Sequence, residues 1–243
     1  MIKLDSKDRK ILAILSINAR RSYSQIGRQT RLHKDSVAYR IKKLEELGVI
    51  SGYTAFFDFS LINHRVYKIY IKFKGIKEEE YKGLYNYLKS EEKVGWIVEG
   101  NGIWDMIIGI IANNVGEFYN FKLFFEEKFH DKIAELDSTT QIQAYFYPRN
   151  YLSQLSKEEV ILYSNKNIVS IDRKDIKIMK ELASNSRSSV VNISKKTGLS
   201  VRTVSYRIKQ LEKLKLILQY RVSLNLEKIG YVFLKAFIKL QNI

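Results

Sequence analysis

A long internal repeat is the feature that most restricts how this chain can fold. Shifted by 167 positions, residues 4–76 align without a gap on residues 171–243, and more than a third of the 73 pairs are identical. The identities run from Asp5 and Asp172 at one end to the last aligned pair at the other. Because self-similarity at a fixed period marks a repeated structural unit, the chain contains two copies of one module, separated by a different segment.

Within each copy, apolar periodicity and capping residues predict three helices followed by a β-rich stretch. In copy one the expected elements are a helix at about 5–18, a helix at about 22–30, a helix at about 34–47 and a small hairpin at 49–59. Copy two repeats this order from Asp172 onward. Three helices and a hairpin form a winged helix-turn-helix, a domain that places its third helix in the major groove of DNA.

The two copies differ at two turns around their helices. Gly198 stands where copy one has Arg31, and glycine suits the turn after the second helix. Ser200 is a good N-cap for the third helix, whereas His33 at the matching position caps poorly. We therefore expect the third helix to begin on a better cap in copy two.

Positive charge is concentrated in the two copies. Residues 1–64 hold 12 Lys+Arg against 6 Asp+Glu, residues 65–150 hold 12 against 13, and residues 151–243 hold 18 against 7. The net charge of +16 is thus +6 and +11 at the ends and −1 in the middle. A general lysine bias kept only for solubility would also have raised the middle, so the pattern indicates two polyanion-binding surfaces separated by a neutral segment.

The outward face of each third helix carries side chains that suit base edges and phosphates. The candidate DNA-binding residues are Lys34, Asp35, Ser36, Tyr39, Arg40 and Lys43 in copy one, and Val201, Arg202, Thr203, Tyr206, Arg207 and Lys209 in copy two. Lysines on this face are expected to neutralise phosphates and so to set the affinity and its salt dependence. The alternative is a solvated helix face, with Tyr39 and Tyr206 packed against the preceding helix.

Several stretches of copy one carry a family resemblance: Leu4-Asp5, Asp8–Leu12, Val37–Ile50 and Gly52-Tyr53. Together they resemble the DNA-binding domain of the Lrp/AsnC family, the feast/famine transcription regulators. The resemblance is weaker in copy two, where Lys215 stands at the position of Gly48 and Gln219 at that of Gly52. It implies a prokaryotic, sequence-specific regulator that binds double-stranded DNA and is cytoplasmic and associated with the nucleoid.

The middle segment alternates strand-like and helix-like patterns. Strands are expected at 67–74, 94–99, 104–111 and 138–147, and helices at 78–90 and 115–129. The order βαββαβ predicts one sheet backed by two helices, a ferredoxin-like domain. It resembles the family's regulatory domain, which implies homo-oligomerisation through this domain and binding of an amino-acid effector. Gly102 and Asp105 match that domain's Gly-x-x-Asp motif, so the resemblance points to an effector site at Gly100, Gly102 and Asp105.

These patterns predict an α+β protein in which two winged helix-turn-helix domains flank a ferredoxin-like βαββαβ domain. The expected boundaries are 1–64 for the first DNA-binding domain, 65–148 for the regulatory and dimerisation domain, 149–170 for a polar linker, 171–229 for the second DNA-binding domain and 230–243 for the first strand of an incomplete second ferredoxin-like domain. That last strand indicates either a fragment of a longer protein or a vestigial element.

Composition narrows the remaining functions. The chain has no cysteine, and its three histidines are scattered, so no disulfide framework or thiolate zinc site is possible and no metal or other cofactor is expected. The strongly apolar run 107–112 is about a third of the ~20 residues that a membrane helix needs, and the N-terminus turns charged at once. We expect a soluble, cytoplasmic protein without a membrane partner.

Three alternatives stay open. Siroheme decarboxylases resemble this family and would need basic and histidine side chains for a tetrapyrrole's carboxylates, but the middle segment holds His130 alone and no clustered acid/base pair. No catalytic residue is therefore assigned and an enzyme is not expected. The basic modules would also suit docking to an acidic protein, or architectural binding of DNA without sequence preference.

Overall fold

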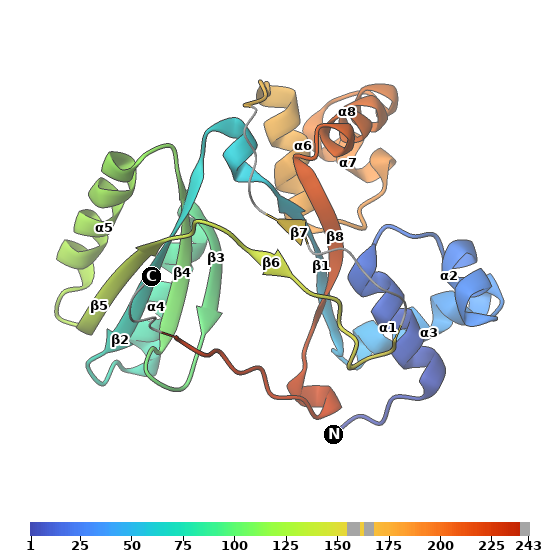
Figure 1. The fold of residues 1–243 in the computed structure, drawn as a ribbon, viewed down its shortest axis with the longest axis horizontal. Helices are drawn as coiled ribbons and strands as arrows, with labels where there is room; N and C mark the ends of the chain where they lie inside the picture. Colours follow the sequence, from blue (N-terminus) through green and yellow to red (C-terminus); the bar gives the residue numbers. More distant parts are fainter. Residues whose placement is uncertain (155–160, 163–167, 239–243) are drawn as a thin grey trace. The chain divides into compact units, whose positions relative to one another are not determined.

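The computed structural model describes residues 1–154, 161–162 and 168–238 (Figure 1). These residues form two compact units. One unit holds what is described of 1–57, 146–160 and 171–243, and the other what is described of 58–145 and 161–170. The two repeat copies therefore belong to a single unit.

The first unit contains both helical modules. The first head consists of α1 (Ser6–Ile17), α2 (Tyr23–Thr30), α3 (Lys34–Glu46) and the strand β1 (Ile50–Phe57). The second head consists of α6 (Arg173–Ser184), α7 (Val190–Thr197), α8 (Val201–Lys213) and the strand β8 (Ile217–Leu224). Figure 1 shows the blue helices of the first head and the orange helices of the second as two separate groups. The three predicted helices per copy are confirmed.

Local capping explains where these helices begin and end. The Asp5 carboxylate accepts a hydrogen bond from the Asp8 backbone N–H at 2.7 Å, and Asp172 caps α6 in the same way. Such caps satisfy backbone N–H groups that have no partner inside the helix. After the second helix the chain takes a left-handed conformation at Gly198 (φ 73°) and at Arg31 (φ 55°). The expected equivalence of these two turns is confirmed.

The hairpin expected at 49–59 does not form. This stretch is one strand, β1, and its antiparallel partner is β8 of the other copy. The alternation of apolar and polar residues predicts a strand, but it carries no information about whether the partner lies a few residues away or in the other copy. The winged helix-turn-helix modules are therefore joined by a shared two-stranded ribbon, and neither head folds its own hairpin over these residues.

The ribbon has the pairing of a two-fold symmetric interface. Thr54 lies opposite Arg221, and Arg221 is also the residue that matches Thr54 in the repeat, at the offset of 167. On either side Tyr53 pairs with Val222, and Ala55 pairs with Tyr220. Self-complementary pairing of this kind is what relates identical subunits in a C2 dimer. Here it relates two copies inside one chain.

The hydrophobic core of this unit crosses between the copies. Helix α1 packs on β8 and α6 packs on β1, so each strand covers the first helix of the other copy. The Ala19 backbone N–H donates to Tyr220 O at 2.9 Å, and the Ser186 N–H donates to Tyr53 O at 3.0 Å. Tyr53 and Tyr220 are both buried. Because each copy completes the core of the other, the heads are expected to unfold together.

The second unit, the sheet domain, contains a four-stranded antiparallel sheet backed by two helices. Its elements, in chain order, are β2 (Arg65–Phe73), α4 (Glu78–Ser90), β3 (Val94–Glu99), β4 (Met106–Ala112), α5 (Val115–Phe129) and β5 (Ile133–Thr140). The strand order is β3-β4-β2-β5. Alternate residues of β2 and β4 meet Leu84 and Leu88 of α4 in one core. Four phenylalanines of α5 complete it, namely Phe118, Phe121, Phe125 and Phe129. The predicted βαββαβ order is confirmed, with one shifted strand.

The fourth strand of this sheet was misplaced by the sequence pattern. It spans Ile133–Thr140, whereas the prediction was 138–147. Its sequence IAELDSTT is polar because β5 lies at the edge of the sheet, next to β2 alone. Ile142, which fits an alternating pattern, is 80% exposed and lies outside any strand. Apolar alternation therefore favoured the wrong register for an edge strand.

Short elements complete the description. The 3-10 helices η1 (Phe59–Ile62) and η2 (Glu227–Ile229) follow β1 and β8, and the short strands β6 (Tyr145–Phe146) and β7 (Ile161–Leu162) pair with each other. Part of the expected linker 149–170 lies outside the described residues. The strand expected at 230–243 is not formed over 231–238, and 239–243 are not described. None of the described helices is both long and apolar enough to cross a bilayer.

Candidate nucleic-acid interface

The third helix of each head turns most of its candidate residues to solvent. Tyr39 on α3 is 67% exposed and Tyr206 on α8 is 60% exposed, so neither packs against the preceding helix. Most of the other candidates are exposed as well, namely Lys34, Asp35, Ser36, Lys43, Val201, Arg202 and Lys209, whereas Thr203 is half-buried. The opposite faces are buried, through Val37, Ile41 and Leu44 in α3 and Val204, Ile208 and Leu211 in α8. Each third helix thus packs into its head through one face and leaves the opposite face open to solvent.

Two of the candidates, Arg40 and Arg207, are engaged inside their own heads. The Arg40 guanidinium lies 2.7 Å from carboxylate oxygens of both Asp5 and Asp8, at the start of α1. Arg207 makes the matching pairs with Asp172 at 2.8 Å and Asp175 at 3.0 Å. The backbone N–H of Asp8 and the Arg40 guanidinium together lower the pKa of Asp5. Both arginines therefore tie the third helix to the first, which is a structural task.

The third helices begin differently in the two heads. Ser200 accepts a hydrogen bond from the Thr203 N–H at 3.1 Å, as an N-cap does. His33 makes no side-chain cap, and its Nδ1 lies 3.2 Å from the Asp35 carboxylate. The expectation of a better cap in the second head is confirmed. The first turn of α3 therefore lacks the side-chain acceptor that Ser200 provides for a backbone N–H of α8.

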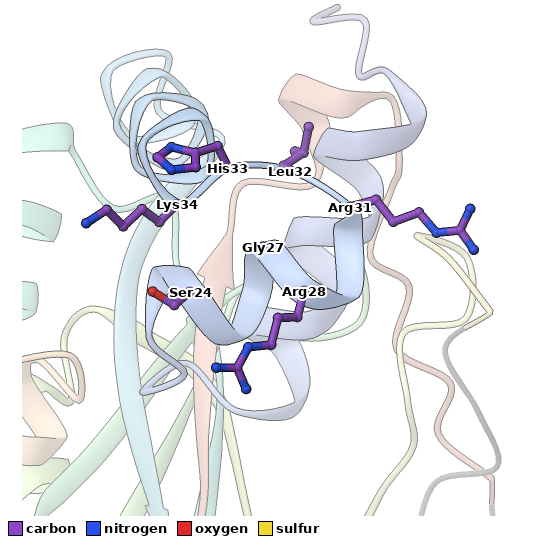
Figure 2. A pocket seen from close by; sticks show the side chains of 7 residues that line it. All are labelled: Ser24, Gly27, Arg28, Arg31, Leu32, His33 and Lys34. Atoms are coloured by element: carbon purple, nitrogen blue, oxygen red, sulfur yellow. The ribbon is translucent and has the colours of Figure 1, made fainter.

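A hollow of about 360 Å³ lies at the turn between α2 and α3 of the first head. It is lined by Ser24, Gly27, Arg28, Arg31, Leu32, His33 and Lys34. Figure 2 shows Arg28 and Lys34 extending to the same side of the turn as Ser24, with Arg31 on the other side. A Cβ at Gly27 would lie 2.5 Å from the Leu32 carbonyl oxygen, so a larger residue here would force the turn of this head to shift. Arg28 and Lys34, on the same side of this shallow hollow, suit a phosphate.

A pair of arginines that the sequence reading missed links the two heads. Arg20 donates to the Ser186 and Ser188 carbonyls at 2.5 and 3.0 Å, and its guanidinium lies over the Tyr220 ring. Arg187 donates to the Ala19 and Arg21 carbonyls and lies over Tyr53. The signal was available, because these arginines are one of the identical pairs in the repeat. Their hydrogen bonds fasten each head to the other, and with it each recognition helix.

The residues assigned to an effector site lie together on the sheet domain, at the turn between β3 and β4. The Asp105 carboxylate accepts hydrogen bonds from Lys72 Nζ at 2.7 Å and the Phe73 N–H at 2.9 Å, and Lys72 also donates to Gly102 O. Burial opposes ionisation of Asp105, but these hydrogen bonds outweigh it and lower its pKa. Gly100 donates its N–H to Asp105 O. A ligand amine would have to compete with Lys72 for this carboxylate.

The residues that the structure describes form no metal-ligating cluster. Within the described ranges no group of three or more His, Cys, Asp or Glu side chains is placed to ligate an ion. His130 lies at the end of α5, where its Nδ1 is 3.0 Å from the Glu127 carbonyl oxygen.

Comparison with known proteins agrees with this geometry. An AsnC-type helix-turn-helix domain matches residues 4–45, and a winged helix-turn-helix DNA-binding domain matches residues 171–217. The HTH-type transcriptional regulator Ptr1 of Methanocaldococcus jannaschii is 31% identical over 127 residues, which cover 50% of this chain and 82% of that protein.

Solved structures share the fold. An AsnC family transcriptional regulator from Agrobacterium tumefaciens has a TM-score of 0.50 at 22% identity, over 60% of this chain and 95% of its own. The siroheme decarboxylase NirDL has a TM-score of 0.56 at 11% identity, over 90% of this chain and 66% of its own. At these identities the likeness is one of fold alone. The matched domains and the sequence relatives together show that the chain belongs to the Lrp/AsnC family of DNA-binding, helix-turn-helix transcription regulators.

Proposed function

We propose that this regulator binds one DNA duplex with both heads at once, with α3 and α8 in the major groove. The observation that carries the proposal is the β1–β8 ribbon, which holds two exposed recognition helices in two-fold relation within a single chain. Helix-turn-helix dimers place two such helices on half-sites that follow the symmetry of the protein. One chain supplies both helices here.

The proposed division of labour follows from the side chains. Lys34, Lys43 and Lys209 are exposed and suit phosphates, because an ammonium group neutralises charge without reading a base. Tyr39 and Tyr206 project from the middle of each helix, where a hydroxyl or ring reaches a base edge or a phosphate. Arg40 and Arg207 act through their ion pairs with the first helix and orient the recognition helix.

Duplex binding by the full chain tests this proposal. Duplexes selected from a random pool are titrated at several salt concentrations against the wild type, Lys43→Ala and Lys209→Ala. Each lysine substitution should weaken binding to all sequences alike and reduce the salt slope by about one. Arg40 and Arg207 are poor test residues, because their loss would leave two carboxylates without their cationic partner in each head.

A matched control is Lys82→Ala, on α4 of the sheet domain. Lys82 is as exposed as the interface lysines and pairs only with Glu78 on its own helix among the described residues. Its removal changes net charge by the same amount and should leave duplex affinity and salt slope nearly unchanged. Equal losses for Lys82→Ala and Lys43→Ala would mean that binding follows net charge alone. If the chain bound an acidic protein but no DNA duplex, the proposal would be overturned.

For the sheet domain we propose homo-oligomerisation and sensing of an amino acid at Gly100, Gly102 and Asp105. The support is the family fold and the placement of these residues at one turn with Lys72. The test is sedimentation and duplex binding with and without a panel of amino acids. Asp105→Asn should abolish any effect of the amino acid and leave basal duplex binding intact.

A second candidate function, siroheme decarboxylation, is favoured only by the fold likeness to NirDL. The described part of the second unit holds His64 and His130, and the Nδ1 of each lies within hydrogen-bond distance of a nearby backbone carbonyl in its own segment. Titration of the protein with an iron porphyrin, followed by absorption spectroscopy, separates the two functions. We expect no shift of the porphyrin's Soret band and no decarboxylation.

We also propose that the protein acts in the cytoplasm, on the DNA of the nucleoid.

A further inference from the structure

The two-fold ribbon gives corresponding positions of the two heads equivalent places on a bound duplex. Thr54 and Arg221 mark its centre, and the contacts of Tyr53 with Ser186 and of Tyr220 with Ala19 repeat about it. If the two recognition helices were identical, the chain would read an inverted repeat with two identical halves. Any difference between the helices must then appear as a difference between the halves.

The helices differ most in their first turn, which is the part that enters the groove in helix-turn-helix domains. Asp35 in α3 corresponds to Arg202 in α8, and both are exposed. A carboxylate accepts a hydrogen bond from the cytosine N4 amino group, whereas a guanidinium donates two to guanine O6 and N7. The two heads therefore ask for opposite hydrogen-bonding patterns at the same place in their half-sites.

Phosphate anchoring is also unequal. The hollow at the turn of the first head is lined by Arg28 and Lys34 on one side of the turn and by Arg31 on the other. The matching positions of the second head are Lys195, Gly198 and Val201, a single cation. The first head is thus built to hold the backbone, and the second head carries its additional cation, Arg202, on the recognition helix itself. Unequal anchoring reinforces unequal base preference.

We propose that the chain binds an asymmetric inverted repeat in one orientation only, with a half-site that presents cytosine to Asp35 and a half-site that presents guanine to Arg202. This inference rests on the proposed binding of duplex DNA by both heads. A homodimer of identical heads reads both halves alike and gives no direction to the site. A single chain with two unlike heads gives the site a polarity.

Site-directed cleavage tests the orientation. The chain has no cysteine, so Glu46→Cys at the end of α3 and Lys213→Cys at the matching position of α8 each create a unique thiol. Each full-length variant is coupled to an iron–EDTA cleavage reagent and bound to a duplex selected by the wild type. Glu46→Cys should cut around one half-site and Lys213→Cys around the other. Equal cutting of both halves by each variant would overturn the inference.

Affinity provides a second readout. Three duplexes are compared: the selected site, a perfect palindrome of its first half and a perfect palindrome of its second half. Each palindrome should bind about 5- to 150-fold more weakly than the selected site, the range for one mismatched base contact. Asp35→Arg should remove most of this penalty for the palindrome of the Arg202 half. Lys82→Ala is the matched control and should keep the wild-type ranking.

The outcomes separate this inference from the function on which it rests. If no duplex is enriched or cut, the binding of DNA by the heads fails. If the wild type selects perfect palindromes and binds them as tightly as any other site, DNA binding stands and the asymmetry fails. Asp35 and Lys82 are both exposed, so neither substitution is expected to disturb the fold. Unchanged thermal unfolding of Asp35→Arg would show that its altered preference does not reflect misfolding.

Discussion

The first and second heads share one interior and differ in what they show to solvent. Identical residues occupy the positions that join the heads or brace them, such as Arg20 and Arg187 or Tyr53 and Tyr220. In both heads the tyrosine hydroxyl donates to a glutamate on the third helix, at 2.5 Å to Glu45 in the first head and 2.7 Å to its counterpart in the second. The difference lies in the turns and recognition helices.

Two of these differences have a local energetic meaning. Lys215 adopts a positive φ of 60° where the first head has Gly48 at 66°, so the second head carries the strain of a side chain in the left-handed region. The first head instead lacks the N-cap that Ser200 supplies. The copies thus keep the same backbone with different local costs, which shows that the shared ribbon and core, and not each local choice, determine the fold.

Removing a ribbon tyrosine should have the largest effect. Tyr53→Ala or Tyr220→Ala deletes a buried ring that packs between the copies, and each should lower the free energy of unfolding by about 3 kcal/mol or more. Hydrogen exchange should quicken in both heads, since each strand covers the helix of the other. Tyr39→Ala, an exposed tyrosine, should cost less than about 0.5 kcal/mol. Loss of protection confined to the substituted copy would break the shared-core comparison.

The reciprocal arginines should come next. Arg20→Ala and Arg187→Ala each remove charge-assisted hydrogen bonds to two carbonyls, worth about 1.5 to 3 kcal/mol in denaturant unfolding. The loss should be larger for Arg187→Ala, because that guanidinium lies over Tyr23 as well as Tyr53. Arg202→Ala, an exposed arginine, is the control for loss of charge. A smaller effect for Arg187→Ala than for Arg20→Ala would contradict the contact geometry.

Exchanging the caps should reverse the local difference between α3 and α8. His33→Ser supplies an acceptor for a backbone N–H of α3 and should stabilise the protein by about 1 kcal/mol, whereas Ser200→Ala should cost about the same. Thermal unfolding of the two single variants and the double variant measures this. The double variant should fall close to the wild type. Destabilisation by His33→Ser would mean that the His33–Asp35 pair matters more than a cap.

Acid unfolding should show the smallest effect, similar in both heads. A backbone N–H and an arginine hold the pKa of Asp5, and likewise that of Asp172, below the ordinary value of a carboxyl group. Because the folded pKa is the lower one, this stabilisation is complete above about pH 4 and is lost as the pH falls through the folded pKa. Asp5→Asn with Asp172→Asn keeps the capping oxygens and should flatten the loss of stability below pH 4. Identical acid limbs for the wild type and the double variant would refute the assignment.

Much of the fold was predictable because it rests on local signals. The helices of both heads follow from apolar stripes and from caps such as Asp5 and Ser200, which act within one turn of chain. The sheet domain follows in the same way except at β5, whose polar edge position hides its strand character. The periodicity placed Tyr39 and Tyr206 opposite the apolar stripe but left open whether they pack against the preceding helix, and the structure leaves both exposed.

The candidate site was predictable as a face and not as a set of contacts. The helix positions of Asp35 and Arg202 are readable from spacing, but the ion pairs of Arg40 with Asp5 and Asp8 join residues more than 30 positions apart. Likewise the cationic hollow needs the turn between α2 and α3 to bring residues of the two helices together. Contacts of this kind depend on the packing of helices against one another, which no local pattern records.

The amino-acid sequence by itself determined that there are two copies of a helical module, where their helices begin and end, and that both are cationic, because repeats, caps and charges are properties of the chain in order. Only the tertiary structure decided that β1 pairs with β8 and that each head completes the core of the other. A strand's alternation specifies a buried face and leaves its partner open. The partner is selected by the burial of Tyr53, Tyr220 and their neighbours across the ribbon.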